Sequence, residues 1–382
     1  MVNYEFDLNS MPNELKLLLL ILRSESDSNQ ALRSLKNASN IDWNYFIELA
    51  QHHRVYPVIY EYLKSIESDL VPERVRSKLH DLYTRNLFQM LSLSGELILI
   101  SNMFRVNRIR WLVLKGPVLA ELLYGDISLR TSKDLDIIIS HTDIDNVRAA
   151  LEQAGYVQQD ETGSSAFTRL KEHHLTFMHP QKRIQLEIHW RLNWSVWGEP
   201  SFDQMWERRD KIQFKGTSIN VLSPEDLFFS LVTHGTRHGW FRLRWLYDMD
   251  RLVKKDLNWD KIIQIMNEYK MPYLGAQVLL LLFWMFNRPV SEKIALFKPN
   301  KKAYILAQMS AGLIQGKNVR RYTLWILNFT GKIAYVLDYF HPKPWDINTL
   351  PLPRMLKFLY IPLRPVLYVW RSYKRQRVTK EH

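Results

Sequence analysis

The sequence predicts an α+β protein in which a central unit with β-strands is flanked by large helical regions. Apolar residues recur with helical spacing over residues 12–108, short β-branched runs separated by turns fill residues 110–222, and helical patterns resume after Ser223. We therefore expect four parts, which are an N-terminal helical region (1–108), an α+β core (109–222), a C-terminal helical region (223–345) and a basic aromatic tail (346–382).

The first helical region contains three stretches with apolar residues three and four apart. They are NELKLLLLILRS, IDWNYFIELAQHHRVYPVIYEYLKSI and the segment from Val75 to Val106. Asn40 to Asp42 is expected to cap the second of these, because short polar side chains accept hydrogen bonds from the free N–H groups of a helix start.

The central unit should contain six short strands and two helices. The expected helices are 117–124 and 142–154, and Gly155 suits the end of the second. The expected strands are Trp111–Leu114, Leu135–Ser140, Ala166–Arg169, Leu175–His179, Ile184–Trp190 and Ser218–Leu222.

The C-terminal helical region begins at a strong start signal. Ser223 can cap a helix, Pro224 suits its first position, and two acids follow in the first turn. Helices are expected to about residue 340, followed by a proline-rich link, HPKPWDINTLPLPR. No internal repeat is visible.

Composition excludes several classes of site. The 382 residues are 46% hydrophobic and 24% charged, as in ordinary globular proteins, and contain no cysteine. Disulfides, thiolate zinc sites and cysteine nucleophiles are therefore excluded. The N-terminus lacks the pattern of a signal peptide, and the apolar run 278–286 is too short to span a bilayer. We expect a cytoplasmic protein, with peripheral attachment to the inner membrane surface as an extension of that expectation.

Positive charge is concentrated at the C-terminus. Residues 301–382 hold fifteen Lys or Arg against three acids, which accounts for +12 of the net charge of +13. Segment 351–382 also contains many aromatic residues and is expected to pack on the protein's own body, to lie on an anionic membrane surface, or to bind RNA. Membrane is favoured over nucleic acid as an external partner.

Lys115-Gly116-Pro117 joins an expected strand to an expected helix. Glycine permits a sharp turn, proline suits the first helical position, and a helix N-terminus can bind an anion through free N–H groups. Lys115 would then meet a phosphate. The alternative is a plain strand-to-helix turn with a solvated lysine.

Asp134 and Asp136 open the expected strand at 135–140. Alternate strand residues face the same way, so the two carboxylates share one face and require a counter-charge, which a divalent metal supplies. Arg130 lies four residues earlier, close enough to orient a carboxylate or contact a phosphate. The pattern indicates metal-dependent phosphoryl or nucleotidyl transfer, with a surface turn and a local ion pair as the alternative.

Glu187 is the best candidate for a third acid. In Ile184–Trp190, alternation places Gln185, Glu187 and His189 on one face and the apolar residues on the other. Glu187 could bind a metal or accept the proton of an attacking hydroxyl. The alternative is a solvent-facing edge strand.

These residues carry a family resemblance. LKGPVLAELLYGDISLRTSKDLDIIIS, followed by QLEIHWRL, resembles the uncharacterised bacterial nucleotidyltransferases of the DNA polymerase β-like superfamily. AQHHRVYPVIYEYL (50–63), THGTRHGWFRLRWLYDMDRLV (233–253) and LPLPRMLKFLYIPLRP (350–365) resemble segments of the same family, so the likeness covers most of the chain.

The resemblance implies a small mixed sheet bearing the acids, with helical flanks. Asp134 and Asp136 would be the paired metal ligands, Glu187 the third acid, and Gly116 part of the nucleotide-binding turn. The superfamily's usual Gly-Ser pair is replaced by Lys115-Gly116, with a longer spacing to the acids. Related toxin-like nucleotidyltransferases also show a Lys-Gly turn.

Segment 233–253 is expected to close over the nucleotide. His234 and His238 are four apart and share a helix face, but no third ligand for zinc is evident. Arg244 is expected to contact the triphosphate, although Arg244 and Asp248 have the same spacing and could pair with each other.

The sequence therefore predicts a Mg²⁺-dependent enzyme with one or two metal ions that transfers NMP, with AMP from ATP favoured, to a hydroxyl-type acceptor. Lys115, Gly116, Arg130 and Arg244 would bind the nucleotide. The acceptor is open among protein, peptide, sugar, small molecule and RNA. The alternatives are a non-catalytic nucleotide-binding or interaction module, and a membrane- or RNA-associated protein that acts through its tail.

Overall fold

The structure is a computed structural model that describes residues 10–23, 41–66, 70–159, 173–193, 197–317, 321–327, 329, 331–333, 344–367 and 370. The chain divides into two compact units. Unit 1 comprises residues 1–158, 173–193 and 197–326, and unit 2 comprises 159–172, 194–196 and 327–382.

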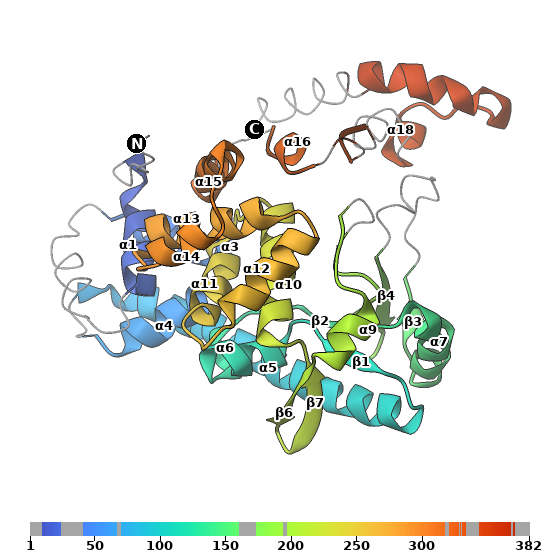
Figure 1. Cartoon of the computed structure of the whole chain (residues 1–382), viewed down its shortest axis with the longest axis horizontal. Coiled ribbons are helices and arrows are strands. Elements are labelled where there is room, and N and C mark those ends of the chain that lie inside the picture. Colours follow the sequence, from blue (N-terminus) through green and yellow to red (C-terminus); the bar gives the residue numbers. More distant parts are fainter. Residues whose placement is uncertain are drawn as a thin grey trace. The chain divides into compact units, whose positions relative to one another are not determined.

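A mixed β-sheet lies at the centre of unit 1 (Figure 1). In the described part of the chain it has seven strands in the order β3-β4-β5-β2-β1-β7-β6. The strands are β1 (Trp111–Val113), β2 (Asp134–Ile139), β3 (Val157–Gln158), β4 (His174–His179), β5 (Ile184–His189), β6 (Asp210–Phe214) and β7 (Thr217–Val221).

Strand β2 occupies the middle of this sheet. It pairs antiparallel with β1 on one side and parallel with β5 on the other. Strand β5 also pairs antiparallel with β4, so it is an interior strand. The mixed α+β class predicted from the sequence is confirmed, and the reading of Ile184–Trp190 as a solvent-facing edge strand is wrong.

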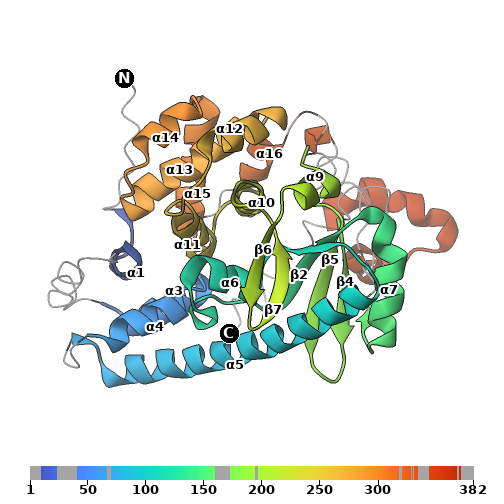
Figure 2. The same cartoon turned by 60° about the horizontal axis from the view of Figure 1, so that its bottom comes forward.

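One face of the sheet packs into the main apolar core. Leu135, Ile137 and Ile139 of β2 are buried there together with Leu186 and Ile188 of β5. They pack with residues of the long helix α5 (Glu73–Val106) and of α7 (Ile144–Gln153), and α5 runs along the sheet in Figure 2. Because side chains alternate between faces, the acids of these strands project from the opposite face.

Helix α5 is the one described helix long and apolar enough to cross a membrane by length and composition. Eleven of its residues are buried, and several belong to the core beneath the sheet.

Helices precede and follow the sheet, as predicted. Asp42 caps its helix by accepting hydrogen bonds from the N–H groups of Asn44 and Tyr45. Ser223 caps α10 (Pro224–Arg237) through the N–H of Asp226, and Pro224 is the first helical residue. The remaining helices of unit 1 are α1 (Asn13–Arg23), α3 (Trp43–His52), α4 (Tyr56–Lys64), α6 (Pro117–Tyr124), α9 (Phe202–Glu207), α10 (Pro224–Arg237), α11 (Leu243–Leu252), α12 (Trp259–Glu268), α13 (Pro272–Phe286), α14 (Ser291–Leu296), α15 (Lys301–Ile314) and α16 (Tyr322–Ile326).

Local differences from the predicted elements are small. The predicted helix at 142–154 begins two residues later, after a 3-10 turn at His141–Asp143. Strands β3 and β6 and helix α9 were not predicted, because their short runs include charged or exposed residues. The predicted strand Ala166–Arg169 lies outside the described residues.

Unit 2 contains short helices where the sequence predicted a proline-rich link. Helix α18 spans Pro344–Thr349, and a 3-10 helix spans Arg354–Leu359. Proline at the first position of α18 has no N–H to donate, so it starts a helix without loss. Arg364 pairs with the buried Asp346 at 3.3 Å, and the Tyr360 hydroxyl donates to the carbonyl of Leu350 at 2.6 Å.

Candidate active site

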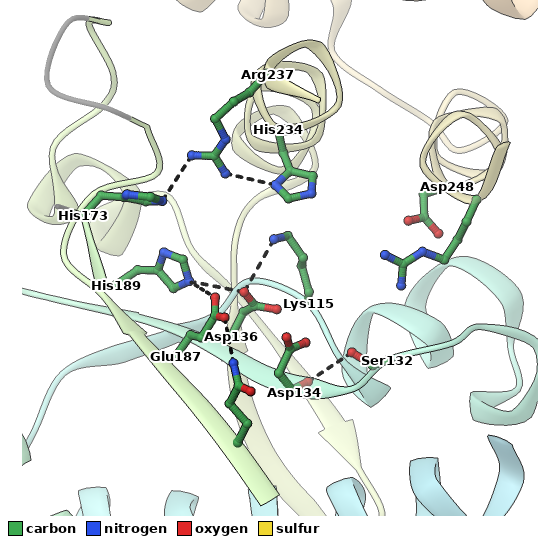
Figure 3. A network of polar contacts seen from close by, with 12 residues as sticks. Lys115, Ser132, Asp134, Asp136, His173, Glu187, His189, His234, Arg237 and Asp248 are labelled. Carbon is green, nitrogen blue, oxygen red and sulfur yellow. Dashed lines mark hydrogen bonds and ion pairs between the residues drawn. The ribbon is translucent and has the colours of Figure 1, made fainter. Parts of the chain in front are cut away.

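The predicted acids meet on neighbouring strands. Residue pairing between the parallel strands β2 and β5 sets Asp136 opposite Glu187 and Asp134 opposite Gln185. The side chains of Asp134, Asp136 and Glu187 lie on the same face (Figure 3). Two acids 51 positions apart in sequence are therefore brought together by strand register, which places the predicted third acid beside the pair.

His189 joins these acids. Its Nε2 lies 3.2 Å from Asp136 Oδ1 and 3.5 Å from Glu187 Oε2. Alternation placed His189 on the same face as Glu187, but no role was predicted for it. Its proximity to Asp136 depends on the pairing of β2 with β5, which local sequence does not reveal.

The Lys115-Gly116 turn faces the same cluster. Lys115 is largely buried, and its Nζ lies 3.5 Å from Asp136 Oδ1. The N–H of Leu114 donates to the carbonyl of Asp136 at 3.0 Å, which fixes the turn next to β2. Gly116 has φ of 81°, a backbone conformation that favours glycine, and it is the N-cap residue directly before helix α6. Lys115 is therefore positioned at the acids, not solvated as in the plain-turn alternative.

Helix α10 contributes an arginine that the sequence analysis did not select. Arg237 donates from Nη1 to His173 Nε2 at 3.1 Å and from Nη2 to His234 Nδ1 at 3.2 Å. Within the described residues, Arg237 has no carboxylate within ion-pair distance, although Asp136 and Glu187 raise its pKa against the stronger lowering by burial. Arg237 lies as a cation beside the acid cluster (Figure 3). In the sequence it is one of several basic residues in segment 233–253, and nothing local distinguishes it from the others.

Arg130 is placed differently from its prediction. Its Nε and Nη2 form a bidentate ion pair with Asp248, at 2.9 and 3.1 Å, and both side chains are buried. The hydroxyl of Tyr124 donates to the same carboxylate at 2.7 Å. Arg130 therefore links the loop before β2 to helix α11, and a direct contact with nucleotide stays a prediction that this geometry does not favour.

Arg244 does not pair with Asp248, the alternative considered from their spacing. It is buried and donates from Nη1 to the carbonyl of Thr131, in the loop that leads to Asp134. Burial, followed by repulsion from Arg130, lowers the pKa of Arg244 to about 9. Arg54, in the turn after α3, is near enough to Asp134 for the acid to raise its pKa, although burial lowers it more.

His234 and His238 lie side by side, with ring centroids 4.8 Å apart. His238 stacks on Trp245 at 4.9 Å. The pKa of His234 is well below its ordinary value because of burial, Lys115 and Arg237, so the imidazole is neutral near pH 7. In the described part of the chain, the groups of His, Asp and Glu whose geometry could hold a metal include neither of these histidines.

The acids have strongly different proton affinities. Burial, then repulsion from Asp136 and Glu187, raises the pKa of Asp134 to about 6. Burial alone would also raise the pKa of Asp136, but Lys115 and His189 hold it well below the usual range. Burial would raise the pKa of Glu187, but its hydrogen bond with His189 lowers it overall. Negative charge therefore concentrates at Asp136 and Glu187, beside the Lys115 ammonium.

The donor set fits a divalent cation. Asp136, Glu187 and His189 each offer one donor atom, and the three atoms lie within 4.8 Å of one another. Carboxylate oxygens suit Mg²⁺ and Mn²⁺, and imidazole suits first-row transition ions. Asp134 lies on the same face, next to this group. A second group of the same kind comprises His173, His174 and His189.

The mixed sheet carries clustered acids with basic side chains opposite them, an arrangement that suits enzymes acting on phosphate esters. Comparison with known families identifies the family. Residues 39–287, more than half of the chain, match the model of the uncharacterised nucleotidyltransferase family, and the chain belongs to that family. It is therefore a nucleotidyltransferase, with a nucleoside triphosphate as substrate and some acceptor.

Two solved structures are similar to this chain. The lincosamide antibiotic adenylyltransferase LnuA, solved with lincomycin bound, is 19% identical over 35% of this chain and 83% of its own, with a TM-score of 0.27. An antigenic nucleotidyltransferase-like protein from Paracoccidioides brasiliensis is 15% identical over 53% of this chain and 92% of its own, with a TM-score of 0.33. No curated protein was found to match the sequence.

Proposed function

We propose that the protein is a Mg²⁺-dependent nucleotidyltransferase that moves AMP from ATP to a hydroxyl-type acceptor and releases pyrophosphate. The observation that supports this most directly is the pairing of Asp136 with Glu187 on parallel strands, with Lys115 at 3.5 Å from Asp136. Carboxylates gathered in this way hold divalent ions, which neutralise triphosphate charge and polarise the reacting phosphate.

The basic side chains around the acids suit the phosphates of the nucleotide. Arg237 is held by two histidines and Arg244 by a backbone carbonyl, and neither has a carboxylate within ion-pair distance in the described residues. A largely buried cation without an anion is costly, and a bound polyphosphate would supply the missing charge. We assign Lys115, Arg237 and Arg244 to the triphosphate, and the Gly116 turn to close backbone approach.

The reaction follows from these positions. The acceptor oxygen attacks the α-phosphorus, the bond from that phosphorus to the bridging oxygen of the β-phosphate breaks, and pyrophosphate leaves with the bond electrons. A carboxylate of the cluster, Glu187 or Asp136, takes the proton of the acceptor hydroxyl. Lys115 and Arg237 stabilise the charge that develops on the departing pyrophosphate.

Label transfer tests the proposal. The protein is incubated with Mg²⁺, an extract as the source of acceptor, and each NTP labelled either at the α- or at the γ-phosphate. We expect transfer from α-labelled ATP, none from γ-labelled ATP, and loss of transfer in Asp136→Asn. Asp145→Asn is the control, because the Asp145 side chain is 90% exposed in a surface pair with Arg148.

Each outcome has a defined meaning. Equal transfer by wild type and Asp136→Asn would remove the assigned site, and transfer of the γ-label would indicate a kinase instead. Transfer from another NTP alone would correct the nucleotide. Fractionation of the labelled extract would identify whether the acceptor is a protein, peptide, sugar, small molecule or RNA.

We also propose that the C-terminal segment 351–382 contacts an anionic membrane surface. In its described part, Met355, Phe358, Ile361, Val366 and Trp370 are exposed, within a region of high positive charge. Apolar side chains among cations are what an anionic lipid surface binds. Sedimentation with phosphatidylserine vesicles should be lost on deleting residues 351–382, and retention by RNA in place of vesicles would refute the lipid assignment.

A further inference from the structure

His189 is a buried histidine that lies beside the acids, where it could bind a metal ion together with them. It lies two residues after Glu187 on β5, on the same strand face, and is 4% exposed. Its backbone partner on β2 is Ile138, so the pairing holds the imidazole next to Asp136. Both strands are interior, which fixes the position of the ring more firmly than a loop would.

The distances fit a shared cation. Ligand atoms at neighbouring corners of an octahedral ion lie about 3 Å apart when each is about 2.1 Å from the ion. His189 Nε2 lies 3.2 Å from Asp136 Oδ1 and 3.5 Å from Glu187 Oε2. The three donor groups therefore need only small adjustments to bind one ion.

We propose that His189 is a metal ligand through Nε2, together with Asp136 and Glu187, so that the site binds Mn²⁺ more tightly than Mg²⁺. The proposal rests on the proposed nucleotidyl transfer function, and it adds a nitrogen ligand to the divalent-metal site of that function. An imidazole donor suits Mn²⁺ and later first-row ions, whereas Mg²⁺ prefers an all-oxygen shell and retains water.

The neighbouring histidine group is a poorer site for the same ion. His173 Nε2 accepts a hydrogen bond from the Arg237 guanidinium at 3.1 Å, which places a positive charge beside that group. His173, His174 and His189 also bring no carboxylate of their own, whereas Asp136 and Glu187 bring two. Attraction of a cation to the two carboxylates favours the mixed group of Asp136, Glu187 and His189.

Pulsed electron paramagnetic resonance of Mn²⁺ tests the ligand directly. Full-length protein in excess over Mn²⁺, without nucleotide, should show the nitrogen coupling of a bound imidazole, and ¹⁵N-labelling of histidine should change that coupling. His189→Gln should abolish the coupling and weaken Mn²⁺ binding at least about tenfold, since even the hydrogen-bond partners of metal ligands contribute about 10–100-fold to metal affinity, and it should weaken Mg²⁺ binding less. His174→Gln, on the adjacent strand, is the matched control and should retain the coupling.

Several results would overturn the proposal. Bound Mn²⁺ with no nitrogen coupling in the wild type would show an all-oxygen site. Because His189 belongs to both groups, loss of the coupling in His174→Gln as well as in His189→Gln would move the ion to the histidine group, and retention of the coupling in His189→Gln would remove His189 as the ligand. No Mn²⁺ binding by the wild type would also refute it. The ¹⁵N experiment requires no variant, so it tests for an imidazole ligand even if His189→Gln fails to fold, and retention of the coupling in His174→Gln then separates the two groups.

The two proposals can fail separately. Nitrogen-coupled Mn²⁺ without any label transfer would remove the enzymatic function and leave the ligand assignment. Label transfer by a protein whose Mn²⁺ shows only oxygen ligands would do the reverse.

Discussion

The ion pair between Arg130 and Asp248 gives the most direct test of how the site is held together. The two side chains are 1% and 0% exposed, respectively, and share two hydrogen bonds. They connect the loop leading to Asp134 with helix α11. We expect Asp248→Asn to destabilise the protein strongly, because the substitution removes the charge that compensates a buried guanidinium.

The size of the effect follows from burial. Removing one partner of a buried ion pair costs about 3–5 kcal/mol, whereas exposed pairs are worth about 0–1 kcal/mol. Asn can still accept the hydrogen bond that the Tyr124 hydroxyl donates to Asp248 at 2.7 Å, so the lost charge accounts for most of the difference. Asp145→Asn, in an exposed pair with Arg148, should cost below about 1 kcal/mol.

Urea unfolding monitored by tryptophan fluorescence, with thermal melts alongside, measures both variants. We expect the melting temperature of Asp248→Asn to fall by at least about 5 °C. The triple variant Arg130→Met, Tyr124→Phe, Asp248→Leu should recover most of that loss, since apolar replacements of a buried pair are often neutral. Equal stability of Asp248→Asn and Asp145→Asn would refute the reasoning, and so would a triple variant no more stable than Asp248→Asn.

Three further predictions concern other residues. Arg237→Gln should weaken binding of a non-hydrolysable ATP analogue by about 10–100-fold in calorimetry, because charge-assisted hydrogen bonds contribute about 1.5–3 kcal/mol. Arg237→Lys should recover part of that affinity. If Arg237→Gln binds the analogue as tightly as the surface variant Arg148→Gln, the assignment of Arg237 to the phosphates is contradicted. Burial, and then His52, lowers the pKa of His53 to about 3, so the stability that its neutral form contributes is present above pH 6.5 and is lost as pH falls towards 3. Between pH 6.5 and 5, the free energy of unfolding of the wild type should fall by about 2 kcal/mol more than that of His53→Asn in urea titrations. Equal losses in the two proteins would refute this. Gly235→Ala should cost about 1–3 kcal/mol, because its Cβ would lie 2.4 Å from the buried ring of Trp240, and an unchanged urea midpoint would show that the ring moves freely.

Elements with strong local signals were predictable from the sequence. Helix α6 occupies the predicted residues Pro117–Tyr124, since proline and glycine mark its two ends. The start of α10 at Pro224 was equally clear from its serine cap and first-turn acids. Short strands such as β6 were missed, because four of its five residues are at least partly exposed and give no alternation towards a core.

The candidate site was predictable only where one strand carries the signal. Asp134 and Asp136 follow from alternation along β2, and Lys115-Gly116 from the turn before α6. The interior position of Glu187, the contact of His189 with Asp136, and the placement of Arg237 depend on pairings between distant segments. Arg130 shows why local sequence could not predict its contact, since its ion-pair partner Asp248 lies 118 residues later.

The sequence alone determined the α+β class, the helical flanks and the identity of the acids, because periodicity, capping residues and the Asp-x-Asp pattern are local properties. The tertiary structure decided which charges meet. The parallel register of β2 and β5 sets Asp136 opposite Glu187 and brings His189 to them, and helix α10 supplies Arg237. Strand order and helix docking arise from burial of apolar surface over the whole unit, so no single motif encodes them.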